Sequence, residues 1–143
     1  MKFTLFLITI VSLAVISCSK NSYTTKPQIT IESINTLIPY DGQLDAKLKF
    51  TDKQGDLGEG SITAVRIRLN QHPPNDSLAD TYVYTIPDFP NKSLGQLEFT
   101  LPANSFHEQT TENDTVQIKF SVIDRAGNKS DTILSPVIVA LYQ

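Results

Sequence analysis

The sequence predicts an all-β protein, built as a two-layer antiparallel sandwich of about seven strands. Three observations support this fold. Apolar and polar residues alternate along seven short segments, which is the pattern of strands with one buried face. Turn residues separate these segments at a spacing typical of sandwiches, with a β-barrel as the alternative. No window of useful length has the helical period, and residues 103–109 form at most one short turn.

The predicted strands are residues 28–34, 43–51, 62–69, 81–86, 96–101, 115–123 and 132–141. In the first strand, Ile29 and Ile31 share one face. In the second strand, apolar residues alternate with charged ones, and we expect four side chains to point inward: Leu44, Ala46, Leu48 and Phe50. These two strands therefore contribute one apolar face each to the core.

The third predicted strand carries two basic residues between apolar ones. We expect three apolar side chains to point inward: Val65, Ile67 and Leu69. Arg66 and Arg68 would then lie on the outer face, in water, because charged side chains are rarely buried.

The fourth predicted strand has two possible inner faces. We favour the arrangement in which Tyr82 and Tyr84 point inward, because aromatic side chains are more often packed than presented. With Val83 inward instead, the two rings would form an exposed platform for a sugar or a peptide. Tyr82 and Tyr84 are therefore the candidate ligand-binding residues.

The last three predicted strands close the sandwich. Leu97, Phe99 and Leu101 point inward from the first of them. The second alternates most regularly, with an inner face of four side chains: Val116, Ile118, Phe120 and Val122. The third contains Pro136, which has no N–H to donate and so requires an edge position or a bulge.

Acidic residues gather in the loops that should share one end of the sandwich. If successive strands alternate in direction, the loops at 52–61, 87–95 and 124–131 lie at the end where the domain begins. Asp52, Asp56 and Asp124 would then converge, together with Asp88. Carboxylates of this kind could bind a structural calcium ion, whereas the simpler interpretation is that Asp and Gly only form turns.

Residues 1–17 have the features of an export signal. Lys2 supplies a positive charge, and an apolar run of about fourteen residues follows, too short to cross a bilayer as a helix. Val15-Ile16-Ser17-Cys18 ends the run. This N-terminus resembles the bacterial lipoprotein signal, with an ordinary secretory signal as the alternative. The resemblance implies cleavage before Cys18, acylation of Cys18, including palmitate, and attachment to a membrane through that lipid.

The organisation that follows is a tether and one domain. Residues 18–26 are polar and form the expected tether, and residues 27–143 form the expected sandwich. Ser19 stands where an inner-membrane retention signal often has Asp, so the resemblance implies the outer membrane. No acidic residue follows in residues 19–22, which leaves both the periplasmic and the cell-surface face open.

Two loop motifs are similar to hairpins of bacterial immunoglobulin-like domains. Residues 124–130 (DRAGNKS) look like the closing hairpin, and residues 50–58 (FTDKQGDLG) like the first hairpin loop of such domains in small envelope lipoproteins. The resemblance implies an immunoglobulin-like or fibronectin type III-like sandwich in a small Gram-negative envelope lipoprotein. The paired cysteines and core Trp of antibody domains are absent, since the chain has one Cys and no Trp.

Composition and motifs together favour binding over catalysis. The net charge of −3 argues against nucleic acid as a partner. No catalytic motif is present, so we expect a non-enzymatic envelope lipoprotein, without a cofactor other than the possible calcium. The domain would act as a spacer or would bind protein or glycan through the loops far from the membrane, residues 70–80 and 102–114. The alternative is a carbohydrate-binding accessory lipoprotein of a glycan-uptake system.

Overall fold

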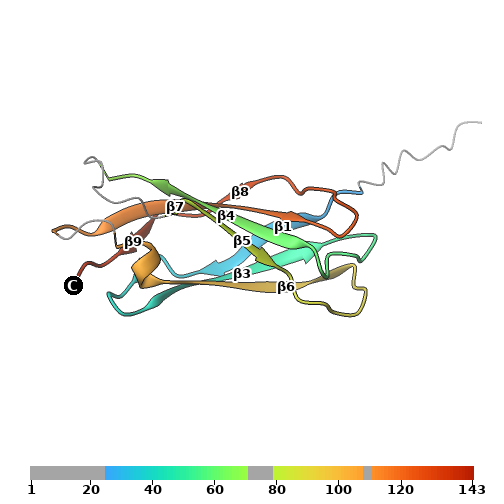
Figure 1. Cartoon of the computed structure of the whole chain (residues 1–143), viewed down its shortest axis with the longest axis horizontal. Coiled ribbons are helices and arrows are strands. Elements are labelled where there is room, and N and C mark those ends of the chain that lie inside the picture. The colour runs from blue at the N-terminus through green and yellow to red at the C-terminus, as the bar shows by residue number, and fades with distance from the viewer. Residues whose placement is uncertain (1–24, 71–78, 108–110) are drawn as a thin grey trace, which may run out of the picture.

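Two β-sheets pack face to face in the computed structural model, which describes residues 25–70, 79–107 and 111–143 (Figure 1). The three-stranded sheet has the order β1-β3-β6. The six-stranded sheet has the order β2-β9-β7-β4-β5, with β8 also paired to β7. Cys18, the signal at 1–17 and most of the tether at 18–26 lie outside the described residues.

The strands are β1 (Gln28–Ile34), β2 (Leu37–Ile38), β3 (Gln43–Thr51), β4 (Ser61–Arg68), β5 (Thr81–Thr85), β6 (Leu94–Pro102), β7 (Asp114–Ile123), β8 (Ile133–Leu134) and β9 (Ile138–Ala140). One 3₁₀ turn, η1 (Ala103–Ser105), follows β6 within the segment expected to hold a short turn. The predicted fold class, an all-β immunoglobulin-like sandwich, is confirmed. Within the described residues, no helix is long and apolar enough to span a bilayer.

The core lies between the two sheets and follows the predicted alternation in β3 and β7. Every second residue of β3, from Leu44 to Phe50, is buried. In β7 the buried apolar set is the predicted one, from Val116 to Val122. Phe120 is fully buried, and the edge of its ring meets Phe99 of the opposite sheet at a centroid distance of 5.3 Å. The two sheets are therefore joined by aromatic as well as aliphatic packing.

The predicted inner face of β4 was wrong. Ile62, Ala64 and Arg66 are buried, whereas Leu69 follows the strand and is 41% exposed. Each face of this strand carries apolar residues: Ile62 and Ala64 lie on the buried face, and Val65 and Ile67 on the half-buried one. Hydrophobicity alone therefore did not distinguish its faces. Arg66 can point inward because its guanidinium finds partners there, as described below.

The last predicted strand is divided in two, and the interruption lies at Pro136. β8 and β9 both pair antiparallel with β7. Between them, the Ser135 hydroxyl accepts the Ile118 N–H at 2.8 Å, and the Ser135 N–H donates to the Ile118 carbonyl at 2.9 Å. Ser135 thus continues the ladder where the proline cannot, whereas the sequence predicted one strand over 132–141 with Pro136 at an edge or a bulge. β2 pairs parallel with β9. It was not predicted, and it lies between the first two predicted strands, at residues 28–34 and 43–51.

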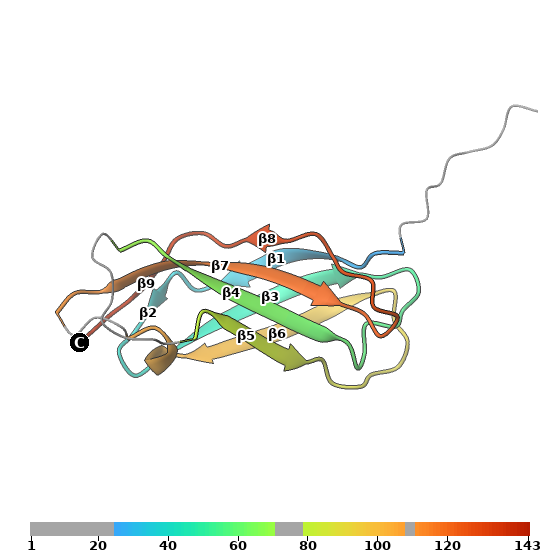
Figure 2. The same ribbon diagram turned by 45° about the horizontal axis from the view of Figure 1, so that its top comes forward.

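The two ends of the sandwich are distinct (Figure 2). The start of β1 and the loops after β3, β5 and β7 lie at one end, called here the base. The C-terminus, η1 and β2 lie at the other end. The described part of the domain therefore enters and leaves at opposite ends, as the alternation of strand direction predicts.

Candidate functional site

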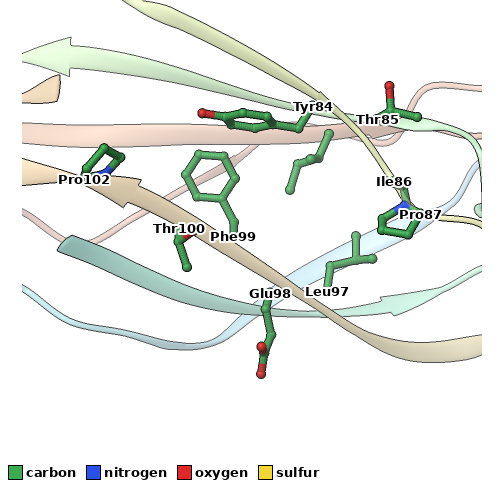
Figure 3. A pocket seen from close by; sticks show the side chains of 10 residues that line it. Tyr84, Thr85, Ile86, Pro87, Leu97, Glu98, Phe99, Thr100 and Pro102 are labelled. Atoms are coloured by element: carbon green, nitrogen blue, oxygen red, sulfur yellow. The ribbon is translucent and has the colours of Figure 1, made fainter.

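One long side of the sandwich is open. β5 is the edge strand of the six-stranded sheet and β6 that of the three-stranded sheet. On the opposite side, β8 of the six-stranded sheet lies against β1 of the three-stranded sheet. Between β5 and β6 lies a cleft of about 360 Å³ (Figure 3). Its lining consists of Ile62, Tyr84, Thr85, Ile86, Pro87, Leu97, Glu98, Phe99, Thr100 and Pro102.

Aromatic and branched side chains form the walls of the cleft. The Tyr84 ring meets Phe99 edge-on at a centroid distance of 5.6 Å, and Phe99 in turn contacts Phe120 in the core. Ile86 and Pro87 lie on the β5 side, facing Leu97 on the β6 side (Figure 3). Glu98 is charged, but its side chain turns away from the cleft and pairs with Lys47 at 3.5 Å. The cleft is thus an apolar slot that opens to solvent.

The two candidate tyrosines share the inner face of β5. Val83 points outward and is 61% exposed, so the alternative with an exposed pair of rings does not form. Tyr82 is half-buried, and its hydroxyl donates to the Ser105 carbonyl at 3.2 Å. Tyr84 remains 44% exposed at the mouth of the cleft. Of the predicted pair, Tyr84 is the residue placed to contact a ligand, and that role stays a prediction.

A buried basic group lies close to the cleft. The Arg66 side chain is fully buried, and its guanidinium donates to the Ser105 carbonyl, which also receives the Tyr82 hydroxyl. The same guanidinium pairs with Asp80 at 3.3 Å, and Arg68 pairs with this carboxylate at 3.2 Å. These bonds tie β4, β5 and η1 together at the end of the sandwich far from the base. Polar contacts therefore hold β4, the start of β5 and η1 together at this end, outside the lining of the cleft.

Sequence reasoning missed the cleft, although it placed several of its residues. Leu97 and Phe99 were predicted to point inward, and both do. Alternation shows which face of a strand is apolar but not whether the opposite sheet covers it. Ile86 and Pro87 gave no signal of their own. The one available sign was that the segment forming β5 contains no charged residue, which is unusual for an edge strand.

The three predicted acidic residues come together at the base. Single carboxylate oxygens of Asp52, Asp56 and Asp124 lie within 4.8 Å of one another. Asp52 directly follows β3, and Asp124 directly follows β7. Gly60 packs closely against the end of β7, where a Cβ would lie 2.2 Å from the Ile123 carbonyl oxygen. Asp88, expected at the same end, is not a member of this group.

Each carboxylate also has a local role in its loop. Asp52 accepts the backbone N–H groups of Gln54 and Asp56 at 3.1 and 3.0 Å. Asp124 accepts the backbone and side-chain N–H groups of Asn128 at 2.7 and 2.9 Å. One oxygen of Asp56, Oδ1, is buried and has no hydrogen-bond partner among the described residues. Turn formation thus explains Asp52 and Asp124 but leaves this oxygen of Asp56 unexplained.

Burial and mutual repulsion destabilise the folded state when Asp52, Asp56 and Asp124 are all ionised. Burial raises the pKa of Asp52, and the charges of Asp56 and Asp124 raise it further. The pKa of Asp52 is therefore higher in the folded state than in the unfolded state. At a pH below the unfolded-state pKa, Asp52 makes its full contribution to stability. That contribution is lost as the pH rises through the folded-state pKa. A hard cation bound by these oxygens would offset the cost. Calcium at Asp52, Asp56 and Asp124 stays a prediction.

Thermal unfolding tests the calcium prediction. We expect the midpoint to be higher with calcium than with a chelator. The difference should increase as the pH rises through the folded-state pKa of Asp52, because more of the three carboxylates are then ionised. Asp52→Asn should abolish the difference, whereas Asp88→Asn at the same end should preserve it. Equal midpoints with calcium and chelator would show that the three residues act in turns alone.

The loops at the end far from the base are described only in part. Of the two segments predicted to meet a partner, 70–80 and 102–114, residues 71–78 and 108–110 lie outside the described residues. In the described part, Tyr40 stacks on His107 at a centroid distance of 4.8 Å beside a shallow hollow. The hollow opens more widely to solvent than the cleft between β5 and β6.

Fold and cleft together define an immunoglobulin-like β-sandwich with one open side. No known family model matches the chain, and no curated protein matches it. Among solved structures, the chain is similar to a cohesin module from a family 33 glycoside hydrolase of Clostridium perfringens. The TM-score is 0.35 with 16% sequence identity, and the match covers 81% of this chain and 97% of that one. This likeness concerns the fold only.

Proposed function

We propose that the chain is a lipid-anchored, non-catalytic binding module of the bacterial cell envelope. The cleft between β5 and β6 carries this proposal. Its walls are apolar, and an apolar slot with a few polar groups at the rim is the usual form of a binding site. Among its lining residues, no hydroxyl lies beside a titratable base that faces the cleft, because Glu98 turns toward Lys47.

The chemistry of the cleft favours a protein segment as the ligand. Tyr84, Ile86 and Leu97 offer aromatic and branched surfaces that suit an apolar anchor side chain. A sugar-binding site would be expected to present aromatic rings as an exposed platform with convergent polar groups. Here Tyr82 is engaged with Ser105, and Tyr84 rests edge-on against Phe99. At this cleft, the glycan-binding alternative is therefore supported by one exposed ring, that of Tyr84.

Membrane attachment is the second part of the proposal. It is supported by the order of charge, apolar run and cysteine in residues 1–18. The outer membrane is the proposed location, on the ground that Ser19 follows the cysteine. The tether would enter the domain at the base, because β1 begins there. The cleft runs along the side of the sandwich, so a tethered domain would leave it accessible.

Parallel selections test the ligand class. The chain is immobilised and exposed to displayed random peptides and to a panel of glycans. We expect enrichment of peptides that share an aromatic or branched aliphatic residue, with no glycan retained. Such peptides should lose binding when Leu97 is replaced by Trp, which fills the slot. Retention of glycans alone would favour the accessory role in glycan uptake, and retention of neither would contradict binding at the cleft.

A further inference from the structure

The edge strand β5 has a sequence that is the same in both directions. It reads Thr81-Tyr82-Val83-Tyr84-Thr85, with Val83 at its centre. Among the described residues, no strand pairs with it on the side away from β4. Its backbone groups on that side are therefore available to another strand.

Hydrogen bonds at the two ends of β5 show which residues face outward. The Asp80 carbonyl accepts the Arg66 N–H at 2.7 Å, and the Ile86 N–H donates to the Gly60 carbonyl at 2.9 Å. Backbone groups of successive residues point alternately to the two sides of an antiparallel strand. Residues 80, 82, 84 and 86 consequently face β4. The N–H and C=O groups of Thr81, Val83 and Thr85 face away from the sheet.

This edge lacks the usual protection against strand pairing. Exposed edges normally carry a charge, a proline or a bulge. β5 has none of these, and it consists of Thr, Tyr and Val, which favour strands. The other edge on this side, β6, carries Glu98 and ends at Pro102. This difference from β6 indicates that the β5 edge can pair with a further strand.

We propose that two copies of the chain pair through β5, antiparallel and symmetric about Val83. The two-fold axis then places Val83 opposite the partner's Val83, Thr81 opposite the partner's Thr85, and Tyr82 opposite the partner's Tyr84. Because Thr81, Val83 and Thr85 direct their backbone groups outward, this register forms roughly six hydrogen bonds between the copies. The two six-stranded sheets become one continuous sheet.

Self-complementarity is the reason to choose a second copy as the occupant. A two-fold interface uses the same surface on both subunits, so each residue must suit its symmetry mate. The palindrome satisfies this for every pair in the strand, with Tyr opposite Tyr on the inner face and Thr opposite Thr on the outer face. An uncharged strand also brings no like charges together. The interface is small, so pairing relies on the proposed anchor to concentrate the copies on one membrane surface.

Cysteine cross-linking tests the register in the full-length chain. In isolated membranes under mild oxidation, Val83→Cys should give a covalent dimer, because the symmetry places the two residues within disulfide range. Val137→Cys is the control, since Val137 is similarly exposed at 48% but lies outside the interface. Equal cross-linking of the two variants, or none at Val83→Cys, would overturn the proposal.

Charge complementation tests the symmetry directly. Two differently tagged full-length copies are expressed together and extracted in detergent after chemical cross-linking. Val83→Lys in both copies, or Val83→Glu in both, should reduce co-purification to background, because like charges oppose each other. Pairing one Lys copy with one Glu copy should restore it. Co-purification of Lys copies at the wild-type level, or no recovery in the mixed pair, would overturn the proposal. Val83 points away from the cleft and is not one of its lining residues, so the substitution itself removes no contact from the cleft.

Discussion

Replacing Arg66 with Ala is expected to lower the free energy of unfolding by about 3 kcal/mol. The Arg66 side chain is fully buried, and its guanidinium bonds the Ser105 carbonyl and Asp80. Truncation would leave that carbonyl with the Tyr82 hydroxyl alone and would open a void where the arginine stem packs. This loss of stability is at the lower end of the range for broken buried ion pairs, because Asp80 is half-exposed and solvent partly screens its charge.

Arg68 provides a matched control for Arg66. It pairs with the same Asp80 carboxylate, at 3.2 Å, but its side chain is 26% exposed. Arg68→Ala should therefore cost about 1 kcal/mol or less. Denaturant unfolding of the two variants measures both values. Equal losses would contradict the view that burial and the Ser105 contact, rather than the shared ion pair, give Arg66 its importance.

Replacing Cys18 with Ser is expected to abolish lipid attachment. Cells grown with labelled palmitate should incorporate the label into the wild-type chain and not into the variant. Each buried methylene of an acyl chain contributes about 0.8 kcal/mol, so loss of the lipid removes the proposed firm anchor. Ser19→Ala is the control, and it should keep the label because the acylated thiol is intact. Label in the Cys18→Ser chain would mean that the lipid lies elsewhere or that the signal is an ordinary secretory one.

The sequence was most informative where one strand face is buried and the other is in water. β3 and β7 alternate without interruption, so both their existence and their inner faces were predictable. Pro136 similarly indicated irregular pairing in the last strand, because a missing N–H is a local property, but it did not show that the strand would divide in two. The convergence of Asp52, Asp56 and Asp124 followed from strand direction alone, which places alternate loops at the same end.

Features that depend on distant partners were beyond the sequence. The inner face of β4 includes Arg66 because the Ser105 carbonyl, 39 residues away in the chain, receives its guanidinium. No local pattern could reveal that partner. The cleft depends on how far β5 and β6 stand apart at the open side, which is a property of two packed sheets. β2 is too short for its two residues to show any period.

The affinity of a selected peptide for two tryptophan variants tests the proposed binding cleft most directly. Leu97 and Leu94 lie on opposite faces of β6, and the cleft is lined by Leu97. Leu97→Trp and Leu94→Trp each add the same side chain, so titration with a fluorescently labelled peptide compares filling of the slot with an equal change on the outer face. We predict at least tenfold weaker binding for Leu97→Trp, about 1.4 kcal/mol, and unchanged binding for Leu94→Trp. Equal affinities in two variants of equal thermal stability would contradict the cleft as the binding site.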